Sequence, residues 1–244
     1  MKVGTDGTLL GAWAKGRRDD STSIRNASEV KTERKWRILD IGTGTGLIAL
    51  MMAQRFPEAE ITGIDIDEKA CEQARENVEA SPFRTVEIKL CDVKEMKGVY
   101  DVIVSNPPYF VDSLENPDDQ RRMARHTSSL SYRELMENAF RLLSDDGEFS
   151  LVIPSETKAQ LEEEAYLAGF FKSRECAVKT TPRKQPRRYL LAFRKHAATS
   201  FEKEEGVIEK SPNVRSDWYQ QLTQDFYLLS DCVSQDNGNT EDNC

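Results

Sequence analysis

The chain has 244 residues, of which 38% are hydrophobic and 31% charged, and this fits one α/β domain with a full hydrophobic core. Three basic and ten acidic residues follow Lys195 and carry −7 of the net charge of −8, so the acidic total does not exclude a nucleic-acid partner. Five cysteines without a Cys-x-x-Cys pair, and only two histidines, argue against a disulfide framework or a metal site. Without a signal core or an apolar span, we expect a cytoplasmic protein with no membrane partner.

Strands and helices are predicted to alternate along most of the chain. A short helix (9–14) precedes an exposed polar connection (17–35). The predicted strands are 37–43, 60–66, 85–91, 100–105, 148–153, 170–179 and 189–194, and the further helices are 47–56, 68–79, 132–143 and 158–168. This order predicts an α/β fold with a seven-stranded, mainly parallel sheet, a C-terminal antiparallel pair and helices on both faces. We expect a single domain over 1–229 and a disordered acidic tail over 230–244.

A polar and aromatic motif, Asn106-Pro107-Pro108-Tyr109, directly follows the predicted strand that ends at Ser105. Asn-Pro-Pro also makes ordinary turns, so the motif alone is a weak signal. It lies some sixty residues after a glycine turn, and an oxygen acceptor beside a flat ring at a strand end suits a planar amine. The two features together therefore predict a site that holds such an amine at the carboxyl ends of the strands.

The glycine turn, Gly42-x-Gly44-x-Gly46, is one residue tighter than the Gly-x-Gly-x-x-Gly of dinucleotide-binding folds. Asp40 stands two positions before the first glycine, where it can meet a cation. A ligand with an amino-acid end and a nucleoside end fits this arrangement better than a nicotinamide dinucleotide does.

Acidic residues also end the next two predicted strands. Asp65, followed by Ile66, lies about twenty residues after the glycines, where a carboxylate can accept hydrogen bonds from ribose hydroxyls. Asp92 closes the third strand and is placed to meet an adenine edge. Ordinary surface carboxylates at strand ends remain the alternative for both acids.

Residues 36–110 resemble the class I S-adenosylmethionine-dependent methyltransferases, and Asn106–Tyr109 is similar to the signature of those that methylate amide or exocyclic nitrogens. The stretches Lys2–Gly7, Leu9–Trp13, Leu39–Ala49 and Asp225–Leu228, with His126, resemble the bacterial tRNA1(Val) adenine-N6 methyltransferase family from Met1 to about Leu229. Members of that family carry a further N-terminal segment before the stretch matching Lys2, and their connection corresponding to residues 17–35 is shorter. We therefore expect either that the start codon has been assigned too late or that the segment covering the cofactor is shortened.

The resemblance implies a Rossmann-like fold, S-adenosyl-L-methionine as cofactor and tRNA as partner, with N6-methylation of the adenosine 3′ of the anticodon, adenosine 37 of tRNA1(Val). The implied cofactor-binding residues share the N-terminal motif, the glycine turn and the strand ends: Lys2, Thr5, Asp6, Asp40, Gly42, Gly44, Gly46, Asp65, Ile66, Asp92 and Asn106.

The implied catalytic residues are Asn106, Pro107 and Tyr109. The Asn106 side-chain oxygen and the Pro107 carbonyl would each accept one N–H of the adenine amino group, and Tyr109 would stack on the base. Pro108 and Phe110 would complete the substrate pocket, although core packing is an equal alternative for Phe110.

Two clusters of basic residues could follow tRNA phosphates. One comprises Arg121, Arg122, Arg125 and His126, and the other comprises Lys179, Arg183, Lys184, Arg187 and Arg188. A solvated charged face is the alternative for both clusters. Lys172 and Arg174 are expected simply on the surface.

Three other functions stay open: a protein-glutamine N5-methyltransferase, another RNA or DNA amino-methyltransferase, and a cofactor-binding RNA chaperone or sensor without turnover. Only about 35 residues precede the first strand, which is short for the helical N-terminal domain of the glutamine enzymes. The roughly 50 residues after the last predicted strand are few for a DNA-recognition domain. We expect a monomer.

Overall fold

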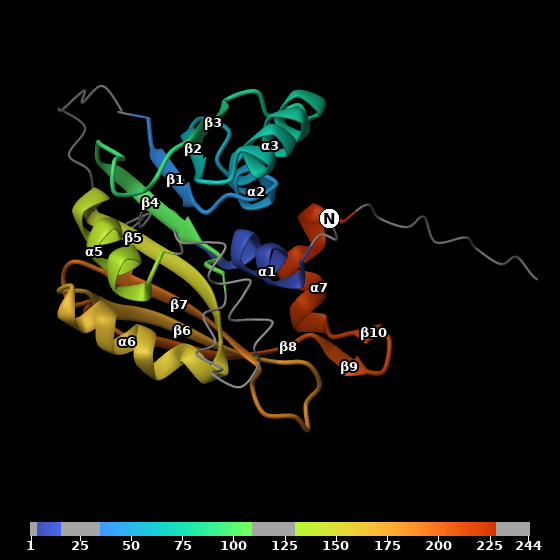
Figure 1. The fold of residues 1–244 in the computed structure, drawn as a ribbon. Coiled ribbons are helices and arrows are strands. Elements are labelled where there is room, and N and C mark those ends of the chain that lie inside the picture. Colours follow the sequence, from blue (N-terminus) through green and yellow to red (C-terminus); the bar gives the residue numbers. More distant parts are fainter. Residues whose placement is uncertain (1–3, 16–34, 109–129, 228–244) are drawn as a thin grey trace, which may run out of the picture.

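One sheet with helices on both faces organises the computed structural model, which describes residues 4–15, 35–108 and 130–227 (Figure 1). The strands of this sheet are β1 (Arg37–Ile41), β2 (Glu60–Asp65), β3 (Val86–Leu90), β4 (Tyr100–Ser105), β5 (Leu143–Pro154), β6 (Phe171–Lys179), β7 (Arg188–Arg194) and β8 (Glu202–Val207). Their order is β3-β2-β1-β4-β5-β7-β6-β8, and the separate strands β9 (Glu209–Ser211) and β10 (Val214–Arg215) form a small second sheet.

The helices are α1 (Thr5–Trp13), α2 (Leu47–Arg55), α3 (Glu68–Ala80), α5 (Tyr132–Leu142), α6 (Lys158–Leu167) and α7 (Asp217–Thr223), with 3-10 turns η1 (Ser155–Thr157) and η2 (Gln224–Phe226). Strands β1 to β5 pair in parallel, and β7 runs antiparallel between β5 and β6. The predicted mainly parallel α/β sheet with a C-terminal antiparallel pair is therefore confirmed. The sheet has one strand more than the seven expected, because β8 adds in parallel to the outer edge of β6.

The central strands of the sheet are buried on both faces, and alternate residues of these strands enter different cores. Val102 and Val104 of β4 pack in the core beneath α1, α2, α3 and α7, whereas Ile103 packs in the core beneath α5 and α6. Figure 1 shows α5 and α6 together on one side of the sheet and α1, α2 and α3 on the other. A strand buried on both faces has apolar residues at successive positions, and Val102–Val104 made β4 recognisable in the sequence.

Helix α5 fixes the loop that follows β3. Its N-terminus is a capping box, in which the Ser131 hydroxyl accepts from the Glu134 N–H and the Glu134 carboxylate accepts from the Ser131 N–H. Near its other end, Arg141 donates to the Met96 carbonyl at 2.8 Å and the Val93 carbonyl at 3.0 Å. Arg141 of α5 therefore fixes the position of the loop that carries Asp92.

Strand β5 begins earlier than predicted, at Leu143 instead of Glu148. Leu143 pairs with Tyr100 and Glu148 pairs with Val102, so the polar residues 144–147 form an irregularity within the strand. The helix before it ends at Leu142, one residue short of the predicted boundary.

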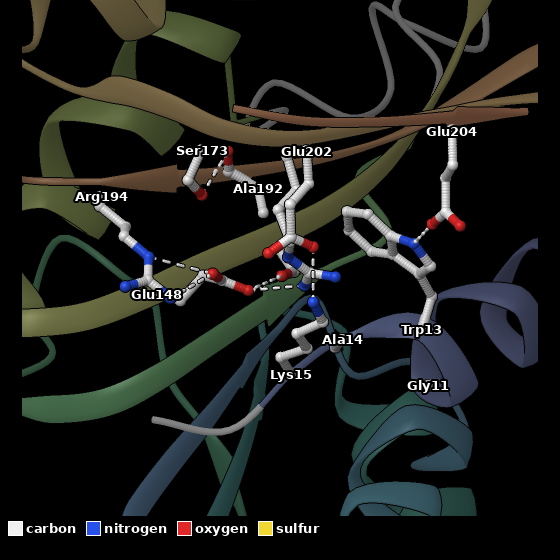
Figure 2. Close-up of polar contacts among 12 residues, drawn as sticks. Gly11, Trp13, Ala14, Lys15, Glu148, Ser173, Ala192, Arg194, Glu202 and Glu204 are labelled. Atoms are coloured by element: carbon white, nitrogen blue, oxygen red, sulfur yellow. Dashed lines mark hydrogen bonds and ion pairs between the residues drawn. The ribbon is translucent and has the colours of Figure 1, made fainter. Parts of the chain in front are cut away.

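A buried ionic network joins β5, β6 and β7 under the C-terminal end of α1 (Figure 2). One oxygen of Glu148 accepts from Arg174 Nη2 at 2.6 Å, and the other accepts from Arg194 Nη2 at 2.8 Å and Nε at 3.1 Å. The Arg174 guanidinium also lies 3.9 Å from the centre of the Trp13 ring. The expectation of Arg174 as a surface residue was wrong, because its charge is compensated by Glu148 inside the fold.

Candidate active site

Strand register brings the predicted site residues to one edge of the sheet. Ile41 of β1 pairs with Ser105 of β4 on one side and with Ile64 of β2 on the other. The Ser105 hydroxyl donates to the Ile41 carbonyl at 2.8 Å. Gly42 and Asn106 each follow one member of this bonded pair, so the glycine turn and the Asn-Pro-Pro motif start side by side.

The three glycines all occupy the left-handed region, with φ of 72° at Gly42, 56° at Gly44 and 79° at Gly46. Only glycine adopts such angles without strain, so the spacing of the motif is a backbone requirement. An added Cβ at Gly42 or Gly44 would meet no described residue within 4 Å, whereas one at Gly46 would lie 3.3 Å from Ala74 Cβ. The first two glycines therefore border space that the described residues leave unfilled, and the third packs against α3.

The Asp40 carboxylate lies beneath this turn and is fully buried. Its Oδ2 accepts from the Thr43 hydroxyl at 2.7 Å and from the Ala49 N–H at 3.2 Å, which ties the turn to α2. Its buried Oδ1 has no hydrogen-bond partner among the described residues. Burial raises the pKa of Asp40 to about 7, since its two hydrogen bonds offset only part of the desolvation.

Asp65, at the end of β2, contacts the same turn from the side. Its Oδ2 accepts from the Gly44 N–H at 2.9 Å and its Oδ1 from the Asp67 N–H at 3.0 Å. Both bonds leave further acceptor capacity, because each carboxylate oxygen carries two lone pairs. The predicted ribose carboxylate is thus within direct reach of the glycine turn.

Two large apolar side chains are exposed beside Asp65. Ile66 is 49% exposed and Leu90, which pairs with Asp65 through the sheet, is 50% exposed. Together they offer an apolar surface at the ends of β2 and β3 that suits a flat nucleobase. The sequence did not indicate that Leu90 is exposed. Leu90 alternates with the buried Val86 and Ile88, and this spacing predicts that it points into the core as they do.

Asp92 lies two residues beyond β3, where its Oδ1 accepts from the Lys94 N–H at 2.9 Å. This bond caps the turn after the strand. Asp92 is half-buried and stands one strand further from Gly42 than Asp65 does.

Within the catalytic motif, Asn106 is half-buried, Pro107 is buried and Pro108 is exposed. Several predicted site residues lie outside the described residues: Lys2, Tyr109, Phe110, Arg121, Arg125 and His126.

The start of α1 reaches the same edge, and an added Cβ at Gly7 would lie 3.1 Å from Leu47 of α2. Thr5 and Asp6 form the first turn of α1. Asp6 Oδ1 lies 2.5 Å from Arg188 Nε. Asp6 was expected to bind cofactor and Arg188 to bind tRNA, and their pairing changes the role that we propose for Arg188.

The loop between β6 and β7 also lies at this edge, because β5 and β6 both run antiparallel to β7. The Arg187 N–H donates to the Val178 carbonyl at 3.0 Å, and its carbonyl accepts from the Ser155 N–H at 3.1 Å. The side chains of Arg183, Lys184 and Arg187 are exposed, and none joins an ion pair recorded among the described residues.

No cluster of three or more His, Cys, Asp or Glu residues able to hold a metal ion occurs in the part of the chain that the structure describes. Among the same residues, no helix has the length and apolar character needed to cross a membrane.

The chain matches one protein family and resembles several solved structures. Residues 7–182 match the methyltransferase small domain family. A predicted O-methyltransferase from Agrobacterium tumefaciens superposes with a TM-score of 0.65 at 17% identity, covering 90% of this chain and 96% of its own. The ribosomal protein L11 methylase of Lactobacillus delbrueckii subsp. bulgaricus gives a TM-score of 0.51 at 16% identity, covering 78% of this chain and 77% of its own. Identities this low show the fold alone.

Sequence relatives are much closer. The tRNA1(Val) (adenine(37)-N6)-methyltransferase of Phocaeicola vulgatus is 46% identical over 231 residues, which cover 93% of this chain and 91% of the relative. The protein of the same name from Bacteroides thetaiotaomicron is 43% identical over 232 residues, with the same coverage. Similarity of this extent over nearly the whole of both chains shows that this chain belongs to the tRNA1(Val) (adenine(37)-N6)-methyltransferase family.

Proposed function

We propose that this protein transfers a methyl group from S-adenosyl-L-methionine to N6 of adenosine 37 in tRNA1(Val), the reaction for which its relatives are named. The observation that carries the proposal is the bond between Ser105 and Ile41, which sets Asn106 beside the glycine turn. Asn106, the proposed acceptor for the amine, and the glycine turn, the proposed binding site for the cofactor, thereby lie side by side at one edge of the sheet.

The residues at this edge fit the cofactor in three respects. No side chain or backbone of the residues that the structure describes fills the space beside Gly42 and Gly44, where the backbone can approach a ligand closely. Asp40 retains a buried oxygen that has no hydrogen-bond partner among the described residues, which suits a ligand with a cationic end. Asp65 would accept from ribose hydroxyls beside the apolar pair Ile66 and Leu90. Thr5 and Asp6 would close the site from α1.

When bound, S-adenosyl-L-methionine supplies a methyl group that its sulfonium already activates, so the protein has only to prepare the amine. An adenine amino group is a weak nucleophile because its lone pair is delocalised into the ring. The Asn106 oxygen and the Pro107 carbonyl would each accept one N–H, which directs the lone pair out of the ring plane and stabilises the developing positive charge. Most of the acceleration is then positioning and electrostatics.

Substrate binding requires the adenosine to leave the stacked anticodon loop, which costs a few kcal/mol. From the sequence, Tyr109 would recover about 1–3 kcal/mol by stacking on the base. The exposed loop residues Arg183, Lys184 and Arg187 would contact phosphates on the same edge of the sheet. We further propose that the protein acts in the cytoplasm as a monomer, which sedimentation at working concentrations would test.

The direct test incubates the protein with methyl-labelled cofactor and separate pools of tRNA, ribosomal RNA, DNA and release factor. We expect label only in tRNA, recovered as N6-methyladenosine. A tRNA1(Val) transcript with guanosine at position 37 should accept no label. Label in release factor would favour the glutamine methyltransferase, and cofactor binding without transfer to any pool would favour the sensor.

A further inference from the structure

The ion pair between Asp6 and Arg188 is largely shielded from solvent. The side chain of Asp6 is 13% exposed and that of Arg188 is 27% exposed, with 2.5 Å between Oδ1 and Nε. A pair this shielded depends strongly on both partners, since removing one leaves the other charge poorly solvated. By contrast, Lys15 and Glu202 form an exposed ion pair, and water can solvate both charges if the pair separates, at little cost in free energy.

Arg188 is anchored at the end of an interior strand of the sheet. It is the first residue of β7, where it pairs with Pro154 of β5 and with Val178 of β6. Its side chain is on the same strand phase as Leu190 and Ala192, which pack in the core beneath α1. Arg188 therefore reaches toward α1 from a backbone position that both neighbouring strands fix.

Helix α1 is held strongly at its C-terminal end. Arg55 donates to the carbonyls of Gly11 at 2.7 Å and Ala14 at 2.6 Å. Trp13 stacks on Arg174 and donates to Glu204 of β8, as Figure 2 shows for the latter pair. These contacts fix the far end of α1 relative to the sheet.

The other end of α1 begins at Gly4, which offers no side-chain cap. Arg188 holds this first turn through Asp6, and the next residue, Gly7, lies against Leu47 at the start of α2. The first turn of α1 thus contacts Arg188 of β7 through Asp6, and the start of α2, directly after the glycine turn, through Gly7.

We propose that Arg188 is a positioning residue for the cofactor: it holds Asp6 and the first turn of α1 beside the start of α2, which directly follows the glycine turn, while its neighbour Arg187 binds tRNA. This inference rests on the proposed function, because it assumes that S-adenosyl-L-methionine binds at that turn. It assigns adjacent arginines to two different ligands, with Arg187 exposed and Arg188 engaged inside the fold.

The test compares Arg188→Ala with Arg187→Ala as the matched control, using calorimetry for cofactor and filter binding for tRNA. Arg188→Ala should raise the cofactor dissociation constant about tenfold, as expected for coupled buried contacts. Its affinity for tRNA without cofactor should stay within about twofold. Arg187→Ala should show the opposite split, with weaker tRNA binding and a salt slope reduced by about one.

A double-mutant cycle then separates positioning from general damage. In an Asp6→Ala background, Arg188→Ala should raise the cofactor dissociation constant no further, because the contact that it supports is already gone. At saturating cofactor, Arg188→Ala should keep its kcat within about twofold while the KM for cofactor rises. Arg188→Lys should restore part of the affinity, since it keeps the charge.

Two results would overturn the inference. The first is a loss of tRNA affinity in Arg188→Ala as large as that in Arg187→Ala, with cofactor affinity intact. The second is an equal rise of the cofactor dissociation constant on Arg188→Ala in the presence and in the absence of the Asp6 side chain. If Arg188→Ala does not fold, Arg188→Gln replaces it, and wild-type cofactor affinity in that variant would equally refute the role. Wild-type protein that binds cofactor but methylates no tRNA would refute the proposed function instead, and the cycle would still be read from cofactor binding.

Discussion

The backbone N–H of Gly44 donates a 2.9 Å hydrogen bond to Oδ2 of Asp65. The carboxylate at the end of β2 is therefore part of the glycine turn after β1, in addition to the ribose contact proposed for it. Since Oδ1 holds the Asp67 N–H, this one side chain connects two strand-to-helix turns. Its loss should affect both the ligand contact and the shape of the turn.

We expect Asp65→Ala to raise the cofactor dissociation constant by roughly 10- to 100-fold, because hydrogen bonds to a charged group contribute about 1.5–3 kcal/mol. Asp65→Asn should fall between wild type and Asp65→Ala, since its amide oxygen can still accept from Gly44. Calorimetry checks both variants, with tRNA affinity as the control that should not change. Full cofactor affinity in Asp65→Ala would remove the ribose role.

Asn106→Ala should lower kcat by at least about 10²-fold, the usual effect of removing one oriented group that stabilises transition-state charge. The cofactor dissociation constant should stay within a few-fold, since Asp65 and the glycine turn are untouched. Single-turnover methyl transfer and calorimetry measure the two quantities separately. Equal losses in both would mean that Asn106 serves mainly the cofactor and that the acceptor lies elsewhere.

The parts of the fold that the sequence predicted are those with local signals. The apolar centre of β4, Val102–Val104, is buried on both faces, and the glycines have positive φ that few other residues tolerate. These signals located the strand ends and hence the edge that carries Asn106 and Asp65.

Long-range pairing left no such signal. Strand β8 begins with four charged residues, Glu202–Glu205, and was not predicted, because only its pairing with β6 makes it a strand. Arg174 looked like a surface residue because its partner Glu148 is 26 positions away. The pairing of Asp6 with Arg188 was likewise invisible, since each motif alone suggested a different ligand. Helix α7 did have a local signal, the Ser216 cap, that sequence reasoning passed over.

Glu148→Ala should destabilise the fold by about 3–5 kcal/mol, because it leaves Arg174 and Arg194 without the buried charge that compensates them. Urea unfolding followed by circular dichroism provides the measurement. Glu202→Ala is a suitable control, since its ion pair with Lys15 is exposed and should change stability by less than about 1 kcal/mol. Similar unfolding midpoints for the two variants would show that the network contributes little.

The buried Asp40 predicts an unusual pH dependence of stability. Burial raises the pKa of this carboxyl from its ordinary 3.8 to about 7, the nearby charge of Asp65 adding to the effect and the bonds from Thr43 and Ala49 opposing it. Between these values the folded protein retains a proton that the unfolded chain releases. The free energy of unfolding should therefore fall as pH rises from about 4 to 7, by an amount on the order of 4 kcal/mol.

Asp40→Asn isolates this effect, because the amide keeps an oxygen for Thr43 and Ala49 but does not titrate. Below pH 4 the neutral carboxyl and the amide should give similar stability. Near pH 8, cofactor-free Asp40→Asn should be the more stable protein, since the wild type then buries a charge whose Oδ1 has no hydrogen-bond partner in the part of the chain that the structure describes. Urea titrations from pH 4 to 8 give both curves, and parallel curves would show that Asp40 ionises normally inside the fold.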